Sequence, residues 1–145
     1  MFQGKTEIKG NVHLVLRDAR GRLKARRVIH NTVPANGLAH VADQLSSAPG
    51  QAAMGWMAVG TGNPTATLLG TEIDRNALTS RTDAGAVVTY VGNWAAGDGT
   101  GALTEAGIFN VVTANTITML CSSSFAVVNK GAADTLQITW TLTLS

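Results

Sequence analysis

Gly60 and Gly62 follow a short apolar run in MAVGTGNPTATLLGTE, the stretch of the chain that comes nearest to a phosphate-binding loop. A dinucleotide fingerprint needs a third glycine, because the tight turn, the approach of the pyrophosphate and the packing of the next helix each exclude a side chain. That position is Thr65, and Pro64 stands where a helix would begin. A Walker loop would also need glycine at Thr65, and lysine after it. The sequence therefore predicts a turn that leaves a strand, not a nucleotide site.

The residues with metal-binding or nucleophilic chemistry are few and scattered. His13, His30 and His40 do not pair with each other, with cysteine or with an acid at the spacing of metal ligands. Cys121 lies in TMLCSSSF, where neither it nor the three following serines form the G-x-S-x-G elbow of a hydrolase. We interpret Cys121 as a buried structural thiol and expect no enzyme activity, no metal and no cofactor.

One acid stands out because of its neighbours. Glu105 lies in LTEAGIFN, where burial of a carboxylate would require a partner. Arg75 and Arg81 are the candidate partners. We expect a structural ion pair here, in preference to a general acid.

Basic residues gather near the N-terminus although the net charge is only +2. Residues 1–30 contain eight Lys or Arg and two acids, a charge of +6, whereas the remaining 115 residues carry −4. Such asymmetry indicates a charged partner or self-assembly between unlike faces.

Four of these residues are the candidate partner-binding residues: Arg22, Lys24, Arg26 and Arg27. The first three alternate with apolar residues after the turn DARG, so they would share one face of a strand. No aromatic residues interleave with them, which does not favour nucleic acid as the partner. Contact with an acidic protein surface and a plain solvated hairpin both remain open, as does the choice between a hairpin and an arm for residues 1–30.

The elements that would position these residues are mostly strands. The C-terminal LQITWTLTLS alternates strictly, with Leu136, Ile138 and Trp140 on one face and polar residues on the other. Six further segments are typical of strands: two around DARG, then GWMAVG, AVVTYVGNW, LTEAGIFNVV and TITMLCSSSFAVVNK. About seven short strands separated by glycine-rich turns predict an all-β fold, a jelly-roll-like β-sandwich formed by residues 1–145 as a single domain.

One short α-helix is expected over residues 36–46. Leu38, Val41, Ala42 and Leu45 form an apolar stripe, which predicts that Leu38 and Leu45 are buried, and Asn36 is the candidate N-cap. The segment LLGTEIDRNAL could add a helical turn. No apolar run approaches the about 20 residues needed to cross a bilayer, and the N-terminus lacks the apolar block of a signal peptide. We therefore expect the protein to be made in a host cytoplasm and not to associate with a membrane.

The order of several segments resembles a family of virion structural proteins from tailed bacteriophages. They are VIHNTVPANGLAHVADQL, MAVGTGNPT leading to LLGTEIDR, LTEAGIFN, and MLCSSSFAVVNKGAADTLQITWTLTL. The resemblance implies a small β-sandwich of the virion without enzyme activity or cofactor.

Within that family resemblance, a capsid cement (decoration) protein is the preferred hypothesis. Such a protein would bind the major capsid protein shell, as a homo-oligomer, and stabilise it. A tail, baseplate or fibre component is the alternative. A carbohydrate-binding or host-surface-binding β-sandwich is a further one, in which Trp56, Tyr90 and Trp94 would form an aromatic platform.

Overall fold

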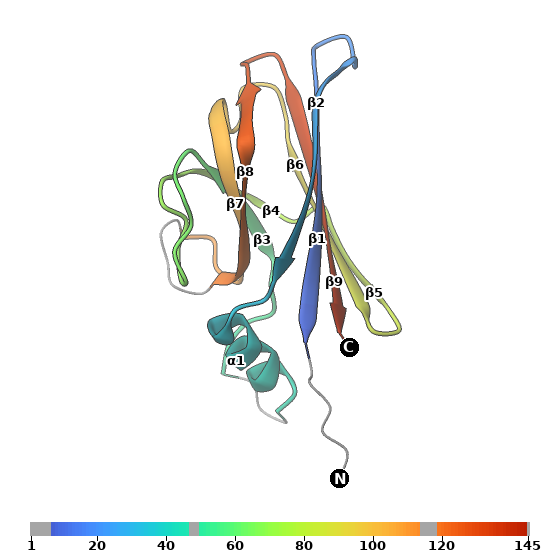
Figure 1. Cartoon of the computed structure of the whole chain (residues 1–145), viewed down its shortest axis with the longest axis vertical. Helices are drawn as coiled ribbons and strands as arrows, with labels where there is room; N and C mark the ends of the chain where they lie inside the picture. The colour runs from blue at the N-terminus through green and yellow to red at the C-terminus, as the bar shows by residue number, and fades with distance from the viewer. Residues whose placement is uncertain (1–6, 47–49, 114–118, 145) are drawn as a thin grey trace.

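Two antiparallel sheets pack face to face in the computed structural model, which describes residues 7–46, 50–113 and 119–144 (Figure 1). The five-stranded sheet contains, in spatial order, β2 (Leu23–Thr32), β1 (Ile8–Arg17), β9 (Thr135–Leu144), β6 (Val87–Trp94) and β5 (Ser80–Ala84). The four-stranded sheet contains β4 (Glu72–Ala77), β3 (Trp56–Gly60), β7 (Gly101–Phe109) and β8 (Met119–Lys130). The predicted all-β sandwich with one short helix is confirmed.

The core lies between the sheets and follows the period-two pattern of the sequence. Burial alternates along β1 and β9, and their register places Val12 opposite Trp140 and Leu14 opposite Ile138. All four side chains are fully buried. Because alternate residues of a strand face opposite sides of the sheet, the intervening residues of β1 and β9 face outward. One face of the five-stranded sheet is therefore core, and the other is left for solvent or a partner.

The basic N-terminal region forms a hairpin over residues 8–32, and residues 1–6 lie outside the described part of the chain. Gly21 occupies the turn with φ +78°, a conformation that costs glycine little. The Asp18 carboxylate accepts hydrogen bonds from the backbone N–H groups of Arg20 and Arg22 at 2.9 and 3.0 Å. These bonds, that from the Arg22 backbone first, hold the pKa of Asp18 below its usual value. The turn is thus fixed by a local acid.

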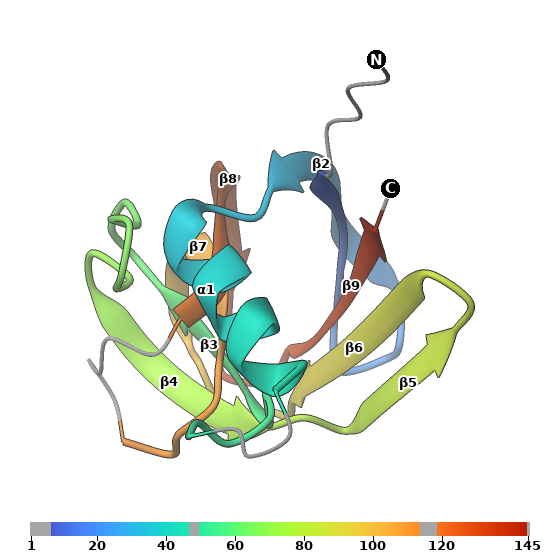
Figure 2. The same ribbon diagram turned by 90° about the horizontal axis from the view of Figure 1, so that it is seen from below.

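The helix α1 (Ala35–Gln44) lies where it was predicted, but its buried face is different. It begins after Pro34, which occupies the N-cap position that we had assigned to Asn36. Leu38 is 41% exposed and Leu45 is 82% exposed, so the prediction that both are buried is wrong. Figure 2 shows α1 lying across the end of the sandwich, between the two sheets.

A glycine explains the rotated helix. Gly37 is buried against β8, so close that a Cβ atom there would lie 2.0 Å from the Leu120 carbonyl oxygen. The covered positions are therefore Gly37, His40, Val41 and Gln44, at i, i+3, i+4 and i+7. The larger side chain of Leu38 could not have allowed this approach. The apolar stripe located the helix, whereas the smallest residue determined which face packs.

The segment LLGTEIDRNAL contains no helical turn, so that expectation is wrong. Its second half is strand β4, which pairs with β3 and places Arg75 opposite Ala58. The missed strand carries polar residues at most positions, because its buried groups form an ion pair described below. A period-two apolar signal was absent for that reason.

We expect Gly37→Ala to destabilise the protein even though alanine is the better helix former. Helix propensity favours alanine by about 1 kcal/mol, whereas overpacking costs about 1–3 kcal/mol. The clash with the Leu120 carbonyl should therefore leave a net loss in chemical denaturation. Leu38→Ala is the matched control, and its effect should stay below about 1 kcal/mol because the side chain is half exposed. A more stable Gly37→Ala variant would contradict this packing.

Candidate interaction surface

Two of the four predicted partner-binding residues form ion pairs within the protein. Arg22 Nε lies 3.1 Å from Asp18 Oδ2, and Lys24 Nζ lies 2.5 Å from Asp134 Oδ2. The Lys24 side chain is 42% exposed, but that of Asp134 is only 6% exposed. Asp134 also accepts a bond from the backbone N–H of Gly131 at 2.7 Å. Lys24 therefore belongs to the structure of the hairpin, and its removal would leave a buried acid without its main partner.

Arg27 closes one edge of the sandwich. Its guanidinium group donates to the carbonyl oxygens of Ala126 and Val127 on β8, at 3.4 and 3.0 Å. Asn31, four residues after Arg27 on β2, donates from its side-chain amide to the Ser122 carbonyl oxygen at 2.8 Å. Unpaired carbonyls of an edge strand invite pairing with other chains, and these side chains occupy them. Arg27 thus joins the two sheets through β2 and β8.

Arg26 is the member of the predicted set that lies on the outward face. Opposite Val15 in the register, it faces away from the core, and its Nε donates to Nε2 of His13 at 2.9 Å. Arg17 of β1 was not among the predicted residues. It is two residues from Val15, so it lies on the same outward face of the sheet, and it is also exposed. Among the described ion pairs, those of Arg22 and Lys24 have no counterpart at Arg26, which is therefore the predicted residue of this face with the least compensated charge.

The outer face of the five-stranded sheet is rich in threonine, valine and amides. We define it by the strand residues that alternate with the core positions. They are Lys9, Asn11, His13, Val15 and Arg17 of β1, Arg26, Val28 and His30 of β2, Thr135, Gln137, Thr139, Thr141 and Thr143 of β9, Val87, Thr89, Val91 and Asn93 of β6, and Ser80, Thr82 and Ala84 of β5. No Asp or Glu is among these described strand residues, whereas three of them carry a positive charge.

A shallow groove crosses this outer face near the hairpin. It has a volume of about 370 Å³ and is lined among others by Val15, Arg17, Asn93 and Gln137. The register brings these residues together from three neighbouring strands, with Val15 opposite Gln137 and Gln137 opposite Asn93. A partner would meet a surface with amide hydrogen-bonding groups beside a cation. Sequence alternation could have identified each residue as outward-facing, but not their lateral order.

Glu105 is fully buried, and its partners are backbone amides. Oε2 accepts from the N–H groups of Gly62 and Thr71 at 2.7 and 2.8 Å, and Oε1 accepts from Gly70 at 2.6 Å. The expected ion pair with Arg75 or Arg81 is absent among the described contacts, so that prediction is wrong. The β3–β4 connection wraps around the acid instead. We call this arrangement the Glu105 clasp.

The glycines of the clasp are required by close contact. A Cβ atom on Gly60 would lie 2.4 Å from Glu105 Oε2, and one on Gly70 would lie 2.2 Å from the Asn63 carbonyl oxygen. Gly60 and Gly62 thus border a loop whose N–H groups do surround an anion, as in phosphate-binding loops. The anion is a side chain of the same protein. Its carboxylate accepts the hydrogen bonds of Gly62, Gly70 and Thr71.

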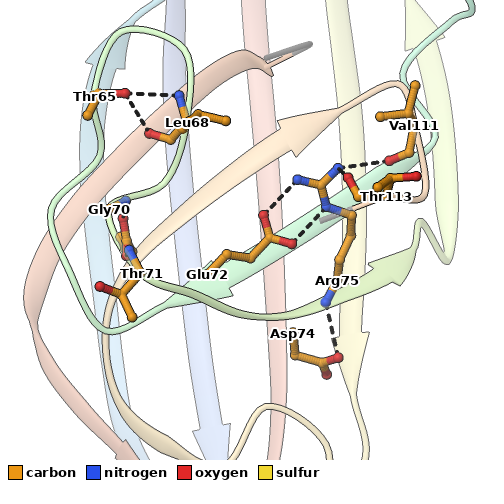
Figure 3. A network of polar contacts seen from close by, with 10 residues as sticks. Thr65, Leu68, Gly70, Thr71, Glu72, Asp74, Arg75, Val111 and Thr113 are labelled. Atoms are coloured by element: carbon orange, nitrogen blue, oxygen red, sulfur yellow. Dashed lines mark hydrogen bonds and ion pairs between the residues drawn. The ribbon is translucent and has the colours of Figure 1, made fainter. Parts of the chain in front are cut away.

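Arg75 instead pairs with Glu72 on the same strand (Figure 3). Arg75 Nε and Nη2 lie 3.0 and 2.6 Å from the two Glu72 oxygens, and the side chains are 3% and 2% exposed. Nη1 donates to the carbonyl oxygens of Val111 and Thr113, and the guanidinium lies 3.7 Å from the centre of the Phe109 ring. A buried ion pair of this kind needs these further bonds to offset its desolvation. Its geometry is structural and leaves no open position for a substrate.

The residues considered for catalysis or metal binding remain apart. Among the described residues, no group of three or more His, Cys, Asp or Glu could hold a metal ion. Cys121 is fully buried, and burial raises the pKa of its thiol far above the usual value. Burial lowers the pKa of His40, which lies on α1, whereas His13 and His30 lie on β1 and β2.

The aromatic residues do not form an exposed platform. Trp94 and Tyr90 are 1% and 7% exposed and belong to the core between the sheets, where burial raises the pKa of Tyr90 to about 12. Trp56 packs on a separate apolar cluster in the other sheet. The three rings therefore cannot bind a sugar together.

No helix in the described ranges is long and apolar enough to cross a membrane.

We expect Glu105→Gln to destabilise the protein by about 2–3 kcal/mol, since its amide group would face N–H donors and lose charge-assisted bonds. Glu105→Ala would leave the amides open for a free anion. Sodium formate should then raise the unfolding midpoint of Glu105→Ala, but not that of the wild type, because a ligand stabilises the state that binds it. Sodium chloride at equal ionic strength is the control. An equal response to both salts would contradict the clasp.

Asp134 should contribute to stability in acid. The hydrogen bond from Lys24, followed by that from Gly131, holds the pKa of Asp134 below its usual value. A group with a lowered pKa stabilises the fold above its unfolded pKa, and this contribution is lost as the pH falls through the folded value. As the pH falls below about 4, the usual pKa of aspartate, wild-type stability should thus fall more steeply than that of Asp134→Asn. Asp83→Asn, on exposed β5, is the matched control for removing one carboxylate, and its free energy of unfolding at pH 7 should stay within about 0.5 kcal/mol of the wild-type value.

Comparison with known proteins gives no assignment. No family model matches the sequence, and neither a curated protein nor a solved structure shows significant similarity to it. The residues, the fold and the geometry of its surfaces are therefore the basis for any functional conclusion.

Proposed function

We propose that the chain is a non-enzymatic structural protein of a tailed-bacteriophage virion, a capsid cement protein that docks on the major capsid protein shell. The observation that carries the proposal is the acid-free outer face of the five-stranded sheet. Arg17 and Arg26 lie on that face, and amide and hydroxyl groups fill much of the rest. The order of sequence segments that resembles virion proteins supports the same class of function.

Charge complementarity is the first reason to choose this face. A face with cations and no opposing strand acids attracts an acidic protein surface, and the attraction acts mainly on encounter and register. The hairpin itself contributes less free charge than its composition indicates, because Arg22 and Lys24 have acid partners. The docking charge is therefore assigned to Arg17 and Arg26, with Lys9 at the far end beside Glu7.

Rigidity is the second reason. The outer face belongs to strands whose other side is the buried core, so its side chains are held on a preformed frame. A preformed surface loses less conformational entropy on binding than a flexible arm. Repetition strengthens it further: when a homo-oligomer touches a lattice at several points, each later contact is effectively intramolecular. Weak contacts per copy then suffice to hold a shell.

The test is co-sedimentation with undecorated capsids of the phage that encodes the chain. The double variant Arg17→Gln/Arg26→Gln removes two charges from the outer face and should reduce capsid affinity at least about tenfold at low salt, with a weaker salt dependence. Lys24 is left intact because it neutralises Asp134. Both changed residues are exposed, so the melting curve should remain near that of the wild type.

A charge-matched control separates the location of charge from its total. Ala77→Glu/Ala102→Glu lowers the net charge by the same amount, on exposed positions of β4 and β7 in the other sheet. It should retain capsid binding. Equal binding by the Arg17→Gln/Arg26→Gln variant and the wild type would remove the outer face from the mechanism. Binding of the wild type to isolated tails and not to capsids would replace the cement role by a tail role.

A further inference from the structure

A second feature of the surface has no role in the docking just described: an apolar pocket beneath α1. The pocket has a volume of about 230 Å³, and its lining includes Ile8 at the start of β1 and Leu142 and Leu144 at the end of β9. Figure 1 shows these two strand ends on the same side of the sandwich as α1. Its walls come from the helix and from both sheets, including Val41, Met54, Leu120 and Leu142. We refer to it as the α1 pocket.

The polar groups at the α1 pocket are unevenly satisfied. No acidic side chain lines it, whereas Arg81 of β5 does. Arg81 donates to the Met54 carbonyl oxygen, and no ion pair joins it to an acid within the described residues. A guanidinium carries five N–H donors, so it retains capacity for a carboxylate. His40 also lines the pocket, and its buried Nδ1 has no partner in the described part of the chain.

The rim of the α1 pocket is apolar and exposed. Leu45, 82% exposed, and Leu144, 39% exposed, both line it. Leu38, 41% exposed, continues the apolar surface along α1. Clustered aliphatic side chains around a hollow, with a charged group at its wall, are typical of a protein interaction site. An occupant that fits both features would cover the exposed leucines of the rim and also fill the pocket.

The size of the α1 pocket limits what can enter. At about 30 Å³ for each water-sized group, 230 Å³ accepts about eight such groups. That is one large side chain such as leucine, phenylalanine or tryptophan. A long lipid chain would not fit, and a small free molecule would leave the rim uncovered.

We propose that the α1 pocket receives one large apolar side chain of a partner polypeptide, and that a neighbouring carboxylate of that polypeptide pairs with Arg81. In the virion this partner is the protein on which the chain docks, so the assignment of the partner rests on the proposed function. The apolar side chain supplies the anchor, and Arg81 selects for an acidic neighbour. The α1 pocket thereby adds a specific contact to the electrostatic docking of the outer face.

The chemistry of the α1 pocket can be tested without any capsid. N-acetyl-L-phenylalanine carries an apolar side chain beside a carboxylate, and N-acetyl-L-phenylalaninamide lacks the charge. In NMR titrations, the acid should shift resonances of Val41 and Leu142 and bind at least about fivefold more tightly than the amide. Arg81→Gln should abolish that preference while leaving the amide affinity unchanged. Equal binding of acid and amide to the wild type would overturn the proposal, as would an unchanged preference in Arg81→Gln.

A matched pair of neighbouring alanines tests the pocket in assembly. Ala53 lines the α1 pocket and Ala52 does not, and both are exposed. Ala53→Phe should occupy the pocket and reduce co-sedimentation with capsids at least about tenfold, whereas Ala52→Phe should bind as the wild type does. Melting curves and the NMR spectra of both variants establish that they are folded.

The outcomes separate this proposal from the proposed function. If the wild type and Ala53→Phe bind capsids equally, the α1 pocket is not a docking site, although the cement role stands. If the wild type binds no capsids, the cement role fails, and the preference for N-acetyl-L-phenylalanine alone decides the pocket chemistry. If Ala53→Phe instead abolishes self-association in sedimentation velocity, the occupant is a second copy of this chain and the partner assignment is overturned.

Discussion

The burial of Glu105 is the constraint on which much of this structure depends. A carboxylate with no exposed surface needs compensation at each oxygen, and here three backbone N–H groups of the β3–β4 connection supply it. Within this loop, Leu69 packs in an apolar cluster with Ala58, Phe109 and Met119. The acid on β7 adds hydrogen bonds to both ends of the connection, at Gly62 and at Gly70 and Thr71. Where the backbone approaches the carboxylate, as at Gly60, there is no space for a Cβ atom, so glycine is required.

Arginine side chains hold both edge strands of the four-stranded sheet, β4 and β8. At one edge, the Arg75–Glu72 pair on β4 is buried, and the guanidinium reaches two carbonyl oxygens beyond β7. At the other edge, Arg27 of β2 bonds carbonyl oxygens of β8 across the gap between the sheets. Both arginines donate to backbone carbonyl oxygens: Arg27 to those of the edge strand β8, and Arg75 to those of the segment that follows β7. Charged residues in this sandwich thus serve mainly to complete the backbone hydrogen bonding.

This use of charge explains how far the sequence could predict the fold and the site. Strict alternation revealed β9 and β1, because apolar burial has a period that residue types record. Glu105 was recognised as a buried acid in need of a partner, but the wrong partner was chosen. Backbone N–H groups occur at nearly every residue, and composition does not tell which of them converge. Likewise, the stripe of Leu38 and Leu45 located α1, whereas the contact of Gly37 with the Leu120 carbonyl depends on tertiary distance. The outer face was predictable residue by residue, and its lateral register was not.

The positions of the outer face and the α1 pocket follow from these constraints. The outer face looks away from the four-stranded sheet, whereas the α1 pocket is lined by α1 and by the ends of β1 and β9. Figure 2 shows that α1 lies across the end of the sandwich. Contacts in two directions could not both be satisfied by one flat partner. Under the proposed cement function, they would suit a position where two subunits of a lattice meet, with the broad charged face on one subunit and the anchored side chain from its neighbour. The weaker contact would limit the strength of such a bridge, because breaking either contact releases the link. The close contact of Gly37 with β8 sets the position of α1 and with it one wall of the α1 pocket, so the proposed binding would depend on the same glycine as the fold.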